Sequence, residues 1–362
     1  MIRVGIIGAG QLGQMLGQAA QSLDIECVFL DPAEDPPARS VGTVIRCAFD
    51  DSRGIRELAS RVDVLTYEFE NVPVSAIESI ATEINVFPPL AALHYAQDRL
   101  VEKQLFVSLG IPVAEFRKID SFSDLRGAAE ELGLPLVLKT RRLGYDGKGQ
   151  IVIRSNDKLA AAWQELGSVA LIAEQMINFD YEVSAIGARN VRGDIVDYPL
   201  TENRHDNGIL QTSRAPAGNA ELTQLAHMYH TKLATELGYV GILAVEFFVV
   251  GRQLIANEFA PRVHNSGHWS QDGAITSQFE NHLRAILDMP LGDPSVRGFV
   301  AMENLIGSLP ANMASIREAG FHTHEYGKAA RPGRKLGHIT LLADSAAERE
   351  QRRQQLLKIM ST

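Results

Sequence analysis

A lysine and a glycine-rich stretch near the middle of the chain could bind a polyphosphate. The apolar run Leu136–Leu138 leads into Lys139, and a second apolar run, Ile151–Ile153, follows a loop that contains Lys148. The tip of this predicted β-hairpin carries Gly144, Gly147 and Gly149. Glycines let backbone N–H groups approach an anion closely, and the lysines add point charges. The spacing fits neither a P-loop nor a kinase loop, so an ordinary hairpin with solvated lysines is an equal alternative.

Two glutamates further along could hold a metal ion against such phosphates. Glu246 lies inside the apolar run Leu243–Val249, and Glu258 ends the next apolar run, with Asn257 beside it. An unpaired buried charge is very costly, and Mg²⁺ takes one or two carboxylates together with substrate phosphates. The alternative is that these acids form ion pairs with Arg262 or another cation.

A polar run directly after these acids is suited to a small anion. It spans Pro261–His268 and contains Arg262, His264 and Asn265. Zinc is not expected, although His264 and His268 have i,i+4 spacing. A glycine between them argues against a helix, and the acid of an H-E-x-x-H motif is absent.

Another acidic pair could recognise a nucleoside. Glu174 ends a predicted strand and Glu182 begins the next one. At a hinge between two domains, a carboxylate and neighbouring backbone groups can bind an adenine edge and a ribose. Two glutamates on the surface are the simpler alternative.

The N-terminal segment has the pattern of a dinucleotide-binding element. A strand at 3–7 leads into a turn with Gly8, Gly10 and Gly13, and the next strand, Cys27–Leu30, ends in Asp31. G-x-G-x-x-G with an acid about 20 residues on is the NAD-binding fingerprint. An NAD-dependent oxidoreductase is therefore one hypothesis, but it leaves Lys139 and the paired glutamates without a purpose.

The elements that position these residues alternate strands and helices. A helix is expected at 92–109, with Asp98 and Arg99 on its polar face. A long helix is expected at 220–237 and another at 275–288, on either side of the strands that carry the metal-binding candidates. The pattern predicts a mixed α/β and α+β protein.

Composition limits the classes of function. The 362 residues are 45% hydrophobic and 22% charged, with a net charge of −9, which suits two or three globular domains and disfavours a nucleic-acid partner. Cys27 and Cys47 make no disulfide framework, which is typical of a reducing cytoplasm. We expect no signal peptide, and no apolar stretch approaches the ~18 residues of a membrane span.

Taken in order, the motifs resemble one known family. They are Gly8-x-Gly10-Gln-Leu-Gly13, Tyr67-Glu-Phe-Glu-Asn-Val-Pro73, Lys139, Gly144-Tyr-Asp-Gly-Lys-Gly-Gln150, Glu174-Gln-Met-Ile177, Glu246, Asn257-Glu-Phe-Ala-Pro-Arg-Val-His-Asn-Ser-Gly-His268 and Arg331-Pro-Gly-Arg-Lys-Leu-Gly-His338. Over nearly its whole length the chain resembles the N5-carboxyaminoimidazole ribonucleotide synthetases, the ATP-grasp carboxylases of bacterial and fungal purine biosynthesis.

The resemblance implies an architecture in four parts. They are a Rossmann-like pre-ATP-grasp domain at 1–113, a small ATP-grasp lid at 114–184, a large ATP-grasp domain at 185–298 and a β-rich C-terminal extension at 299–362 packed on it. It also replaces the NAD hypothesis. The first glycine turn is expected to face the phosphate of a ribonucleotide at a helix N-terminus.

The implied reaction joins ATP, bicarbonate and 5-aminoimidazole ribonucleotide through carboxyphosphate, giving ADP, phosphate and N5-carboxyaminoimidazole ribonucleotide. The amine attacks either carboxyphosphate itself or CO₂ that carboxyphosphate releases in the closed site. Mg²⁺ is the expected metal, with Mn²⁺ as a substitute. A cytoplasmic homodimer is expected, with functional coupling to the mutase that uses the product. A formate-dependent glycinamide ribonucleotide transformylase is the nearest alternative within the superfamily, and a non-catalytic nucleotide-binding subunit is a more distant one.

Site residues follow from the resemblance, position by position. ATP is expected at Arg99, Lys139, Gly144, Tyr145, Asp146, Gly147, Lys148, Gly149, Gln150, Glu174, Gln175, Met176, Ile177, Glu182, His205, Asn257 and Glu258. Mg²⁺ is expected on Glu246 and Glu258, and the ribonucleotide at Gln11, Leu12, Glu70, Asn71, Arg334 and Lys335. Catalytic roles are expected for Arg262, His264, Asn265, Asp146 and Lys335. Lys148 stands where the family is expected to have arginine, which keeps the charge but loses the bidentate fork.

Overall fold

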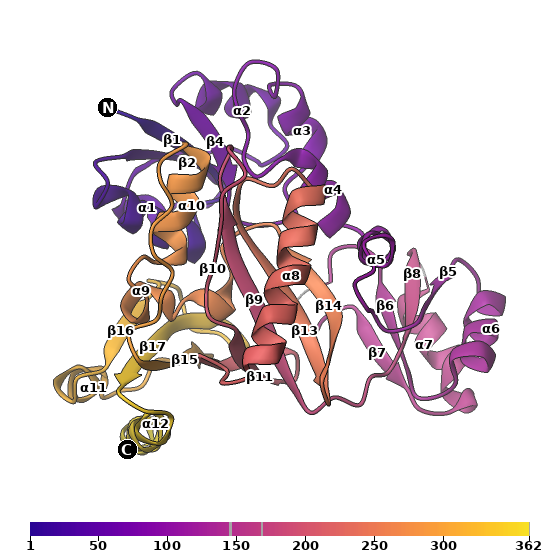
Figure 1. The fold of residues 1–362 in the computed structure, drawn as a ribbon. Helices are drawn as coiled ribbons and strands as arrows, with labels where there is room; N and C mark the ends of the chain where they lie inside the picture. The colour runs from indigo at the N-terminus through magenta and orange to yellow at the C-terminus, as the bar shows by residue number, and fades with distance from the viewer. Residues whose placement is uncertain (145–146, 168, 362) are drawn as a thin grey trace.

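The computed structural model describes residues 1–144, 147–167 and 169–361, and these residues form three sheets. Figure 1 shows an N-terminal unit at the top, a long central sheet and a smaller unit at the right, with the C-terminal helix at the bottom. The predicted mixed α/β and α+β class is confirmed. No helix among the described residues has both the length and the apolar character of a membrane span.

The N-terminal sheet is parallel, with strand order β3-β2-β1-β4. Its strands are β1 (Arg3–Ile7), β2 (Glu26–Leu30), β3 (Thr43–Ile45) and β4 (Val64–Tyr67), and its helices are α1 (Gln11–Gln21), α2 (Ser52–Ala59) and α3 (Val74–Glu78). Because β1 and β4 are parallel neighbours, the loops that follow them lie at the same edge of the sheet. These loops are the glycine turn and the segment that contains Glu70 and Asn71.

The helix predicted at 92–109 is in fact two helices, α4 (Leu90–Ala96) and α5 (Arg99–Ser108). Asp98 caps α5, because its Oδ1 accepts a hydrogen bond from the N–H of Leu100 at 3.1 Å. Asp98 was predicted to lie on a polar face, but it is buried and pairs with Arg141. The break therefore directs Arg99 and the rest of the first turn of α5 towards the interior.

The smaller unit contains an antiparallel sheet with strand order β5-β8-β6-β7. Its elements are β5 (Phe116–Ile119), α6 (Phe122–Leu132), β6 (Leu136–Thr140), β7 (Gln150–Ile153), α7 (Leu159–Leu166) and β8 (Leu171–Gln175). The predicted hairpin is confirmed, since Lys139 and Gln150 are opposite each other where β6 and β7 meet the loop. Tyr145 and Asp146 lie outside the described residues.

The central sheet follows the path β14-β13-β9-β11-β12-β15-β17-β16, with β10 paired to β9. Its strands are β9 (Tyr181–Arg189), β10 (Ile195–Asp197), β11 (Thr201–Asp206), β12 (Ile209–Ala215), β13 (Gly241–Val250), β14 (Gln253–Ala260), β15 (Phe299–Ile306), β16 (His322–Glu325) and β17 (Lys335–Ala343). The C-terminal extension thus continues the same sheet, because β15 pairs with β12. The boundary predicted at 184/185 falls inside β9, and we propose that the lid ends between β8 and β9 instead.

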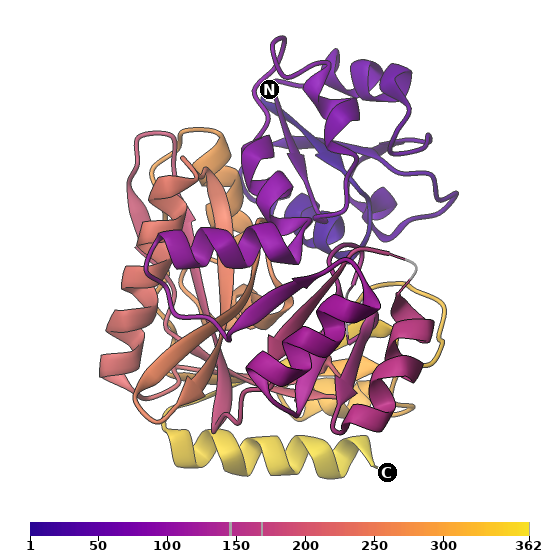
Figure 2. The same ribbon diagram turned by 90° about the vertical axis from the view of Figure 1, so that its right-hand side faces the viewer.

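Alternation along β13 separates two apolar layers. Leu243 and Val245 belong to the core that contains α8 (Ala220–Glu236), whereas Ile242 and Ala244 belong to the core that contains α10 (Gln278–Ile286). Successive side chains of a strand point to opposite faces, so Glu246 lies on the same face as Ile242 and Ala244. Figures 1 and 2 show this arrangement of the sheet and α8 from two sides. The helix predicted at 275–288 starts at Gln278, because Ser277 caps it.

The remaining helices cover the C-terminal half: α9 (Ser270–Gly273), α11 (Met313–Glu318) and α12 (Ala346–Met360). A buried ion pair attaches α12 to the sheet, because Arg353 binds Glu303 of β15. Glu303 also accepts a hydrogen bond from Thr212 Oγ1 at 2.9 Å.

We expect Arg353→Met to lower the free energy of unfolding by about 3–5 kcal/mol, because it leaves the Glu303 carboxylate buried without its cation. Chemical denaturation measures this loss. The double variant Arg353→Met/Glu303→Leu serves as the control and should be more stable than the single variant, since no charge is left unpaired. A double variant that is less stable than the single one would contradict this account.

Candidate active site

One cavity of about 1120 Å³ lies where the three sheets meet. Most of the residues predicted for ATP, metal, anion and ribonucleotide binding line this single cavity. They are Gln11, Leu12, Glu70, Asn71, Arg99, Lys139, Gly144, Gly147, Lys148, Gln150, Glu182, His205, Glu246, Asn257, Glu258, Arg262, His264, Asn265, Arg334 and Lys335. Residues far apart in the sequence therefore share one space, which can hold several substrates at once.

The two glutamates predicted to bind metal are neighbours across β13 and β14. Glu246 lies opposite Glu258 in the antiparallel register, and the register then shifts so that Asn257 is an extra residue on β14. Such a β-bulge redirects side chains next to an active site. Burial and, to a smaller extent, the nearby charge of Glu258 raise the pKa of Glu246 to about 7, although His205 opposes them. Burial also opposes ionisation of Glu258, but Arg99 outweighs this effect and lowers the pKa of Glu258 to about 2.

The geometry around these acids fits a cation that also binds phosphates. The described residues contain no group of three or more His, Cys, Asp or Glu that could hold a metal ion by themselves. Two carboxylates side by side repel each other, and Mg²⁺ takes one or two carboxylates with substrate phosphates. Glu258 pairs with Arg99 at 2.7 Å, so the ion-pair alternative also holds for this residue, although its partner is not Arg262.

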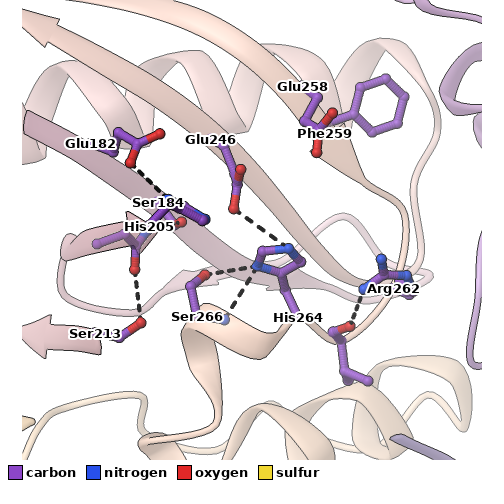
Figure 3. A network of polar contacts seen from close by, with 12 residues as sticks. Glu182, Ser184, His205, Ser213, Glu246, Glu258, Phe259, Arg262, His264 and Ser266 are labelled. Atoms are coloured by element: carbon purple, nitrogen blue, oxygen red, sulfur yellow. Dashed lines mark hydrogen bonds and ion pairs between the residues drawn. The ribbon is translucent and has the colours of Figure 1, made fainter. Parts of the chain in front are cut away.

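The polar loop after β14 forms the wall next to the acids. Figure 3 shows His264 between Glu246 and Ser266. His264 Nδ1 lies 2.8 Å from Ser266 Oγ, and Nε2 lies 3.6 Å from a Glu246 oxygen. Burial, with Arg262 nearby, lowers the pKa of His264 to about 3. The ring is therefore neutral at neutral pH, so its contact with Glu246 is not a charge pair.

Two further side chains of this loop, Arg262 and Asn265, line the cavity and could bind an anion. Arg262 binds Glu70 through its Nε and is partly buried, so this pair joins the central sheet to the loop after β4. Among the described residues, both polar side-chain atoms of Asn265 are buried without a hydrogen-bond partner. An orphaned buried amide is unfavourable unless a ligand satisfies it, which indicates a polar ligand at this point.

Cations from two different elements gather on the opposite side of the acids. Lys139 of β6 and Lys103 of α5 share one Glu174 oxygen, at 3.1 and 3.3 Å. Burial lowers the pKa of Lys139, and Glu174 partly offsets this effect. Arg99 also donates a hydrogen bond to the carbonyl of Gly144, so it reaches the glycine-rich loop. The arrangement fits a chain of phosphates between the loop and the glutamates.

We expect Lys139→Ala to raise the KM for ATP by about 10- to 100-fold, because a charge-assisted contact to phosphate is lost. Glu174 keeps Lys103 as a partner in this variant, so the fold should persist. Initial rates over a range of ATP concentrations measure the effect. Lys158→Ala, which removes an exposed lysine of the same unit, is the matched control, and equal KM values for the two variants would remove Lys139 from the phosphate site.

The far end of the cavity is apolar and could hold a base. Phe179 and Phe248 stack with ring centroids 4.6 Å apart, and Val137 and Val152 lie on the same lining. The predicted adenine readers Glu174, Gln175, Met176 and Ile177, and also Gly149, are not part of that lining. Glu174 is buried against the two lysines, so its side chain faces cations rather than the cavity. Glu182 does line the cavity and binds His205 Nδ1 at 2.7 Å.

The glycine turn after β1 differs from the expectation that it receives a phosphate. The N–H groups of Gly10 and Gly13 donate to the carboxylate of Glu68, at 2.5 and 2.6 Å. These amides are therefore already used inside the protein. Gln11 and Leu12 still line the cavity, as predicted from the resemblance.

Sequence reasoning missed four residues that support the site: Glu68, Glu102, Lys103 and Gln278. Lys103 Nζ donates to the carbonyl of Asn257 at 2.7 Å, and Glu102 accepts from the N–H of Phe259, so both hold the bulge of β14. Gln278 binds the N–H and the carbonyl of His264 with one amide. The available signal was a pair of adjacent opposite charges, Glu102 and Lys103, in the middle of a predicted helix.

Comparisons with known proteins extend over the whole chain. Family models match 1–97 (ribonucleotide synthetase preATP-grasp domain), 104–279 (ATP-grasp domain) and 300–352 (phosphoribosylaminoimidazole carboxylase C-terminal domain). An N5-carboxyaminoimidazole ribonucleotide synthase of Pseudomonas aeruginosa is 47% identical over 340 residues, which cover 94% of each chain.

Solved structures show the same extent of similarity. The crystal structure of an N5-carboxyaminoimidazole ribonucleotide synthetase from Thermus thermophilus has a TM-score of 0.94, with 44% identity over 99% of both chains. An N5-carboxyaminoimidazole synthase from Aspergillus clavatus, in complex with ADP and 5-aminoimidazole ribonucleotide, has a TM-score of 0.92. It is 31% identical and covers 99% of this chain and 98% of its own.

Proposed function

Because this chain belongs to the N5-carboxyaminoimidazole ribonucleotide synthase family of ATP-grasp proteins, we propose that its cavity joins ATP, bicarbonate and 5-aminoimidazole ribonucleotide. The protein is an ATP-dependent carbon–nitrogen ligase that makes N5-carboxyaminoimidazole ribonucleotide in purine biosynthesis. ATP and the aminoimidazole ribonucleotide are its substrates. The proposal concerns bicarbonate, the metal and the task of each residue.

One observation carries this division of tasks. Of the paired acids, Glu258 contacts Arg99, one of the cations, at 2.7 Å, whereas Glu246 lies 3.6 Å from His264 of the polar loop. A nucleotide with its base near Phe248 would extend its phosphates towards these acids. The polar loop that contains His264 and Asn265 would then lie on the far side of the terminal phosphate, where the attacking oxygen must be.

Glu246 and Glu258 would hold Mg²⁺ as its protein ligands, with Mn²⁺ as a substitute. When bound, such an ion neutralises charge on the phosphate oxygens. Arg99 forms an ion pair with Glu258 in the structure, and it would turn to the phosphates when ATP is bound. This exchange of partners keeps Glu258 from being an unpaired buried charge in either state.

Two bond-forming steps suit the rest of the cavity. A bicarbonate oxygen attacks the γ-phosphorus and ADP leaves, which gives carboxyphosphate. The exocyclic amine of the ribonucleotide then forms a bond to the carboxyl carbon as phosphate leaves and the amine loses a proton. Arg262 and Asn265 would hold the carboxyl oxygens, and neutral His264 would donate or accept one hydrogen bond.

The acceptor would lie on the N-terminal side of this loop. Gln11, Leu12, Glu70 and Asn71 approach from the parallel sheet, while Arg334 and Lys335 approach from the C-terminal extension. A catalytic role of Lys335, and of Asp146 outside the described residues, stays a prediction. The homodimer, the cytoplasmic location and the coupling to a mutase stay predictions as well.

The experiment that tests the proposal measures ADP release from Mg²⁺-ATP. It compares bicarbonate buffer with CO₂-depleted buffer that contains formate, with and without 5-aminoimidazole ribonucleotide. Release that requires bicarbonate and rises with the ribonucleotide supports the proposal. Release that requires formate would favour a transformylase-like ligase, and release that depends on neither acid would remove bicarbonate from the reaction.

A further inference from the structure

The glycine turn between β1 and α1 binds a carboxylate of its own chain. Glu68 directly follows β4, the parallel neighbour of β1, and its side chain lies across the N-terminus of α1. One carboxylate oxygen accepts the N–H of Gly10 and the other accepts the N–H of Gly13. Glu68 is 8% exposed, so this contact is almost entirely inside the protein. Figure 1 shows β1, β4 and α1 together in the N-terminal unit.

The three glycines of the motif make room for this carboxylate. A Cβ atom at Gly8 would lie 2.4 Å from Glu68 Cγ, and one at Gly10 would lie 2.7 Å from Glu68 Oε1. At Gly13 the nearest Glu68 atom would be Oε2 at 3.3 Å. In a dinucleotide-binding protein these glycines let the backbone approach a diphosphate. Here the same space holds a carboxylate that is part of the fold.

The acid of the dinucleotide-binding fingerprint, Asp31, is also used internally. Asp31 accepts the N–H of Ala9 at 2.9 Å and the N–H of Ala33 at 2.8 Å, so its carboxylate holds the turn rather than a ribose. Asp31 does not line the cavity, whereas Glu68 does. The two carboxylates bind the same loop from different sides, which makes Asp31 a matched control for Glu68.

Glu68 connects two walls of the cavity. The turn continues into Gln11 and Leu12, and the segment after Glu68 continues into Glu70 and Asn71. Both walls are thus tied to one carboxylate. We propose that Glu68 is a positioning and specificity-determining residue, which acts as an internal anion on the N-terminus of α1, holds both walls in place for the ribonucleotide and excludes a dinucleotide diphosphate.

The charge of Glu68 has a consequence for the ribonucleotide phosphate. A second anion at the same amides would be repelled and would find both N–H groups occupied. The phosphate must therefore bind other donors of the cavity, among them Arg331 and Arg334. This inference rests on the proposed function, because that function assigns the two walls to the ribonucleotide.

The test compares Glu68→Ala, Glu68→Gln and Asp31→Asn with the unaltered protein. We expect Glu68→Ala to raise the KM for the ribonucleotide by about tenfold or more, while the KM for ATP changes less than about twofold. Sodium acetate should lower the raised KM again, because its carboxylate fits the vacated space and both amides. Glu68→Gln should show the same KM split without acetate rescue, since the amide still fills the space, and Asp31→Asn should show neither effect.

Other results would overturn the inference. A parallel rise of both KM values, or an equal effect of Asp31→Asn, would make Glu68 a purely structural residue. If Glu68→Ala does not fold, the KM split of Glu68→Gln decides alone. A saturable NADH fluorescence signal with the unaltered protein would contradict the proposal that Glu68 excludes a dinucleotide diphosphate. Because the unaltered protein is assayed for bicarbonate dependence in parallel, failure of the proposed function is seen separately from failure of this inference.

Discussion

Glu258→Gln is expected to lower kcat for ADP release by about 100- to 1000-fold while the protein stays folded. The change keeps the shape of the side chain and an oxygen that can accept from Arg99, but it removes the charge that a metal ion and the phosphates require. It also ends the repulsion with Glu246, whose pKa is raised partly by Glu258. Loss of the ion pair and relief of this repulsion oppose each other, so the free energy of unfolding should change little.

The measurement is ADP release over a range of Mg²⁺ concentrations, together with thermal unfolding. Glu202→Gln is a suitable control, because Glu202 also lies in the central sheet and pairs with an arginine, Arg214, but does not line the cavity. Glu258→Gln with near-normal turnover would remove Glu258 from the metal site. A loss of turnover that is matched by unfolding would show a structural role only.

Arg262→Met is expected to reduce both stability and turnover strongly. Arg262 is the cation of a partly buried pair with Glu70, so its removal leaves this carboxylate without a partner and lowers the free energy of unfolding. The loss of turnover has a separate cause, because the variant lacks the guanidinium group that would hold the carboxyl oxygens. Arg262→Lys keeps the charge but not the fork, and turnover should fall to an intermediate level.

A double variant separates the two effects of Arg262. Arg262→Met/Glu70→Leu removes both charges, so chemical denaturation should show that stability returns towards the original value. Single-turnover ADP formation should stay low in this variant if Arg262 acts on the anion. Recovery of turnover along with stability would mean that Arg262 only neutralises Glu70 and holds the loop in place.

The predicted elements with strong local patterns are confirmed. The hairpin around the glycine-rich loop was predictable because two apolar runs flank a glycine cluster, and β6 and β7 pair there as expected. The motifs themselves indicated the family, and the position of Glu246 within an apolar run indicated a strand. The hairpin and the strand need only residues close in the sequence, whereas the family follows from the order of the motifs along nearly the whole chain.

Predictions that depended on the burial of charges were less successful. Asp98 was placed on a polar face, yet it is buried, caps α5 and pairs with Arg141, which is 43 residues away in the sequence. The adenine role of Glu174 stays a prediction, but the burial of its carboxylate against two lysines, Lys103 and Lys139, was not foreseen. A charged residue on a helix or strand looks the same in the sequence whether water or a distant ion faces it.

The sequence by itself determined the family, the strands and the residue types available for chemistry, because alternation, glycine spacing and motif order are properties of the chain before it folds. Only the tertiary structure decided that Glu258 lies opposite Glu246 with Asn257 as a bulge beside it, that Arg262 reaches Glu70, and that Glu68 fills the glycine turn. These contacts join residues on different sheets or strands. Their partners are chosen by packing and by the cost of an unpaired buried charge, which acts only once the chain has folded.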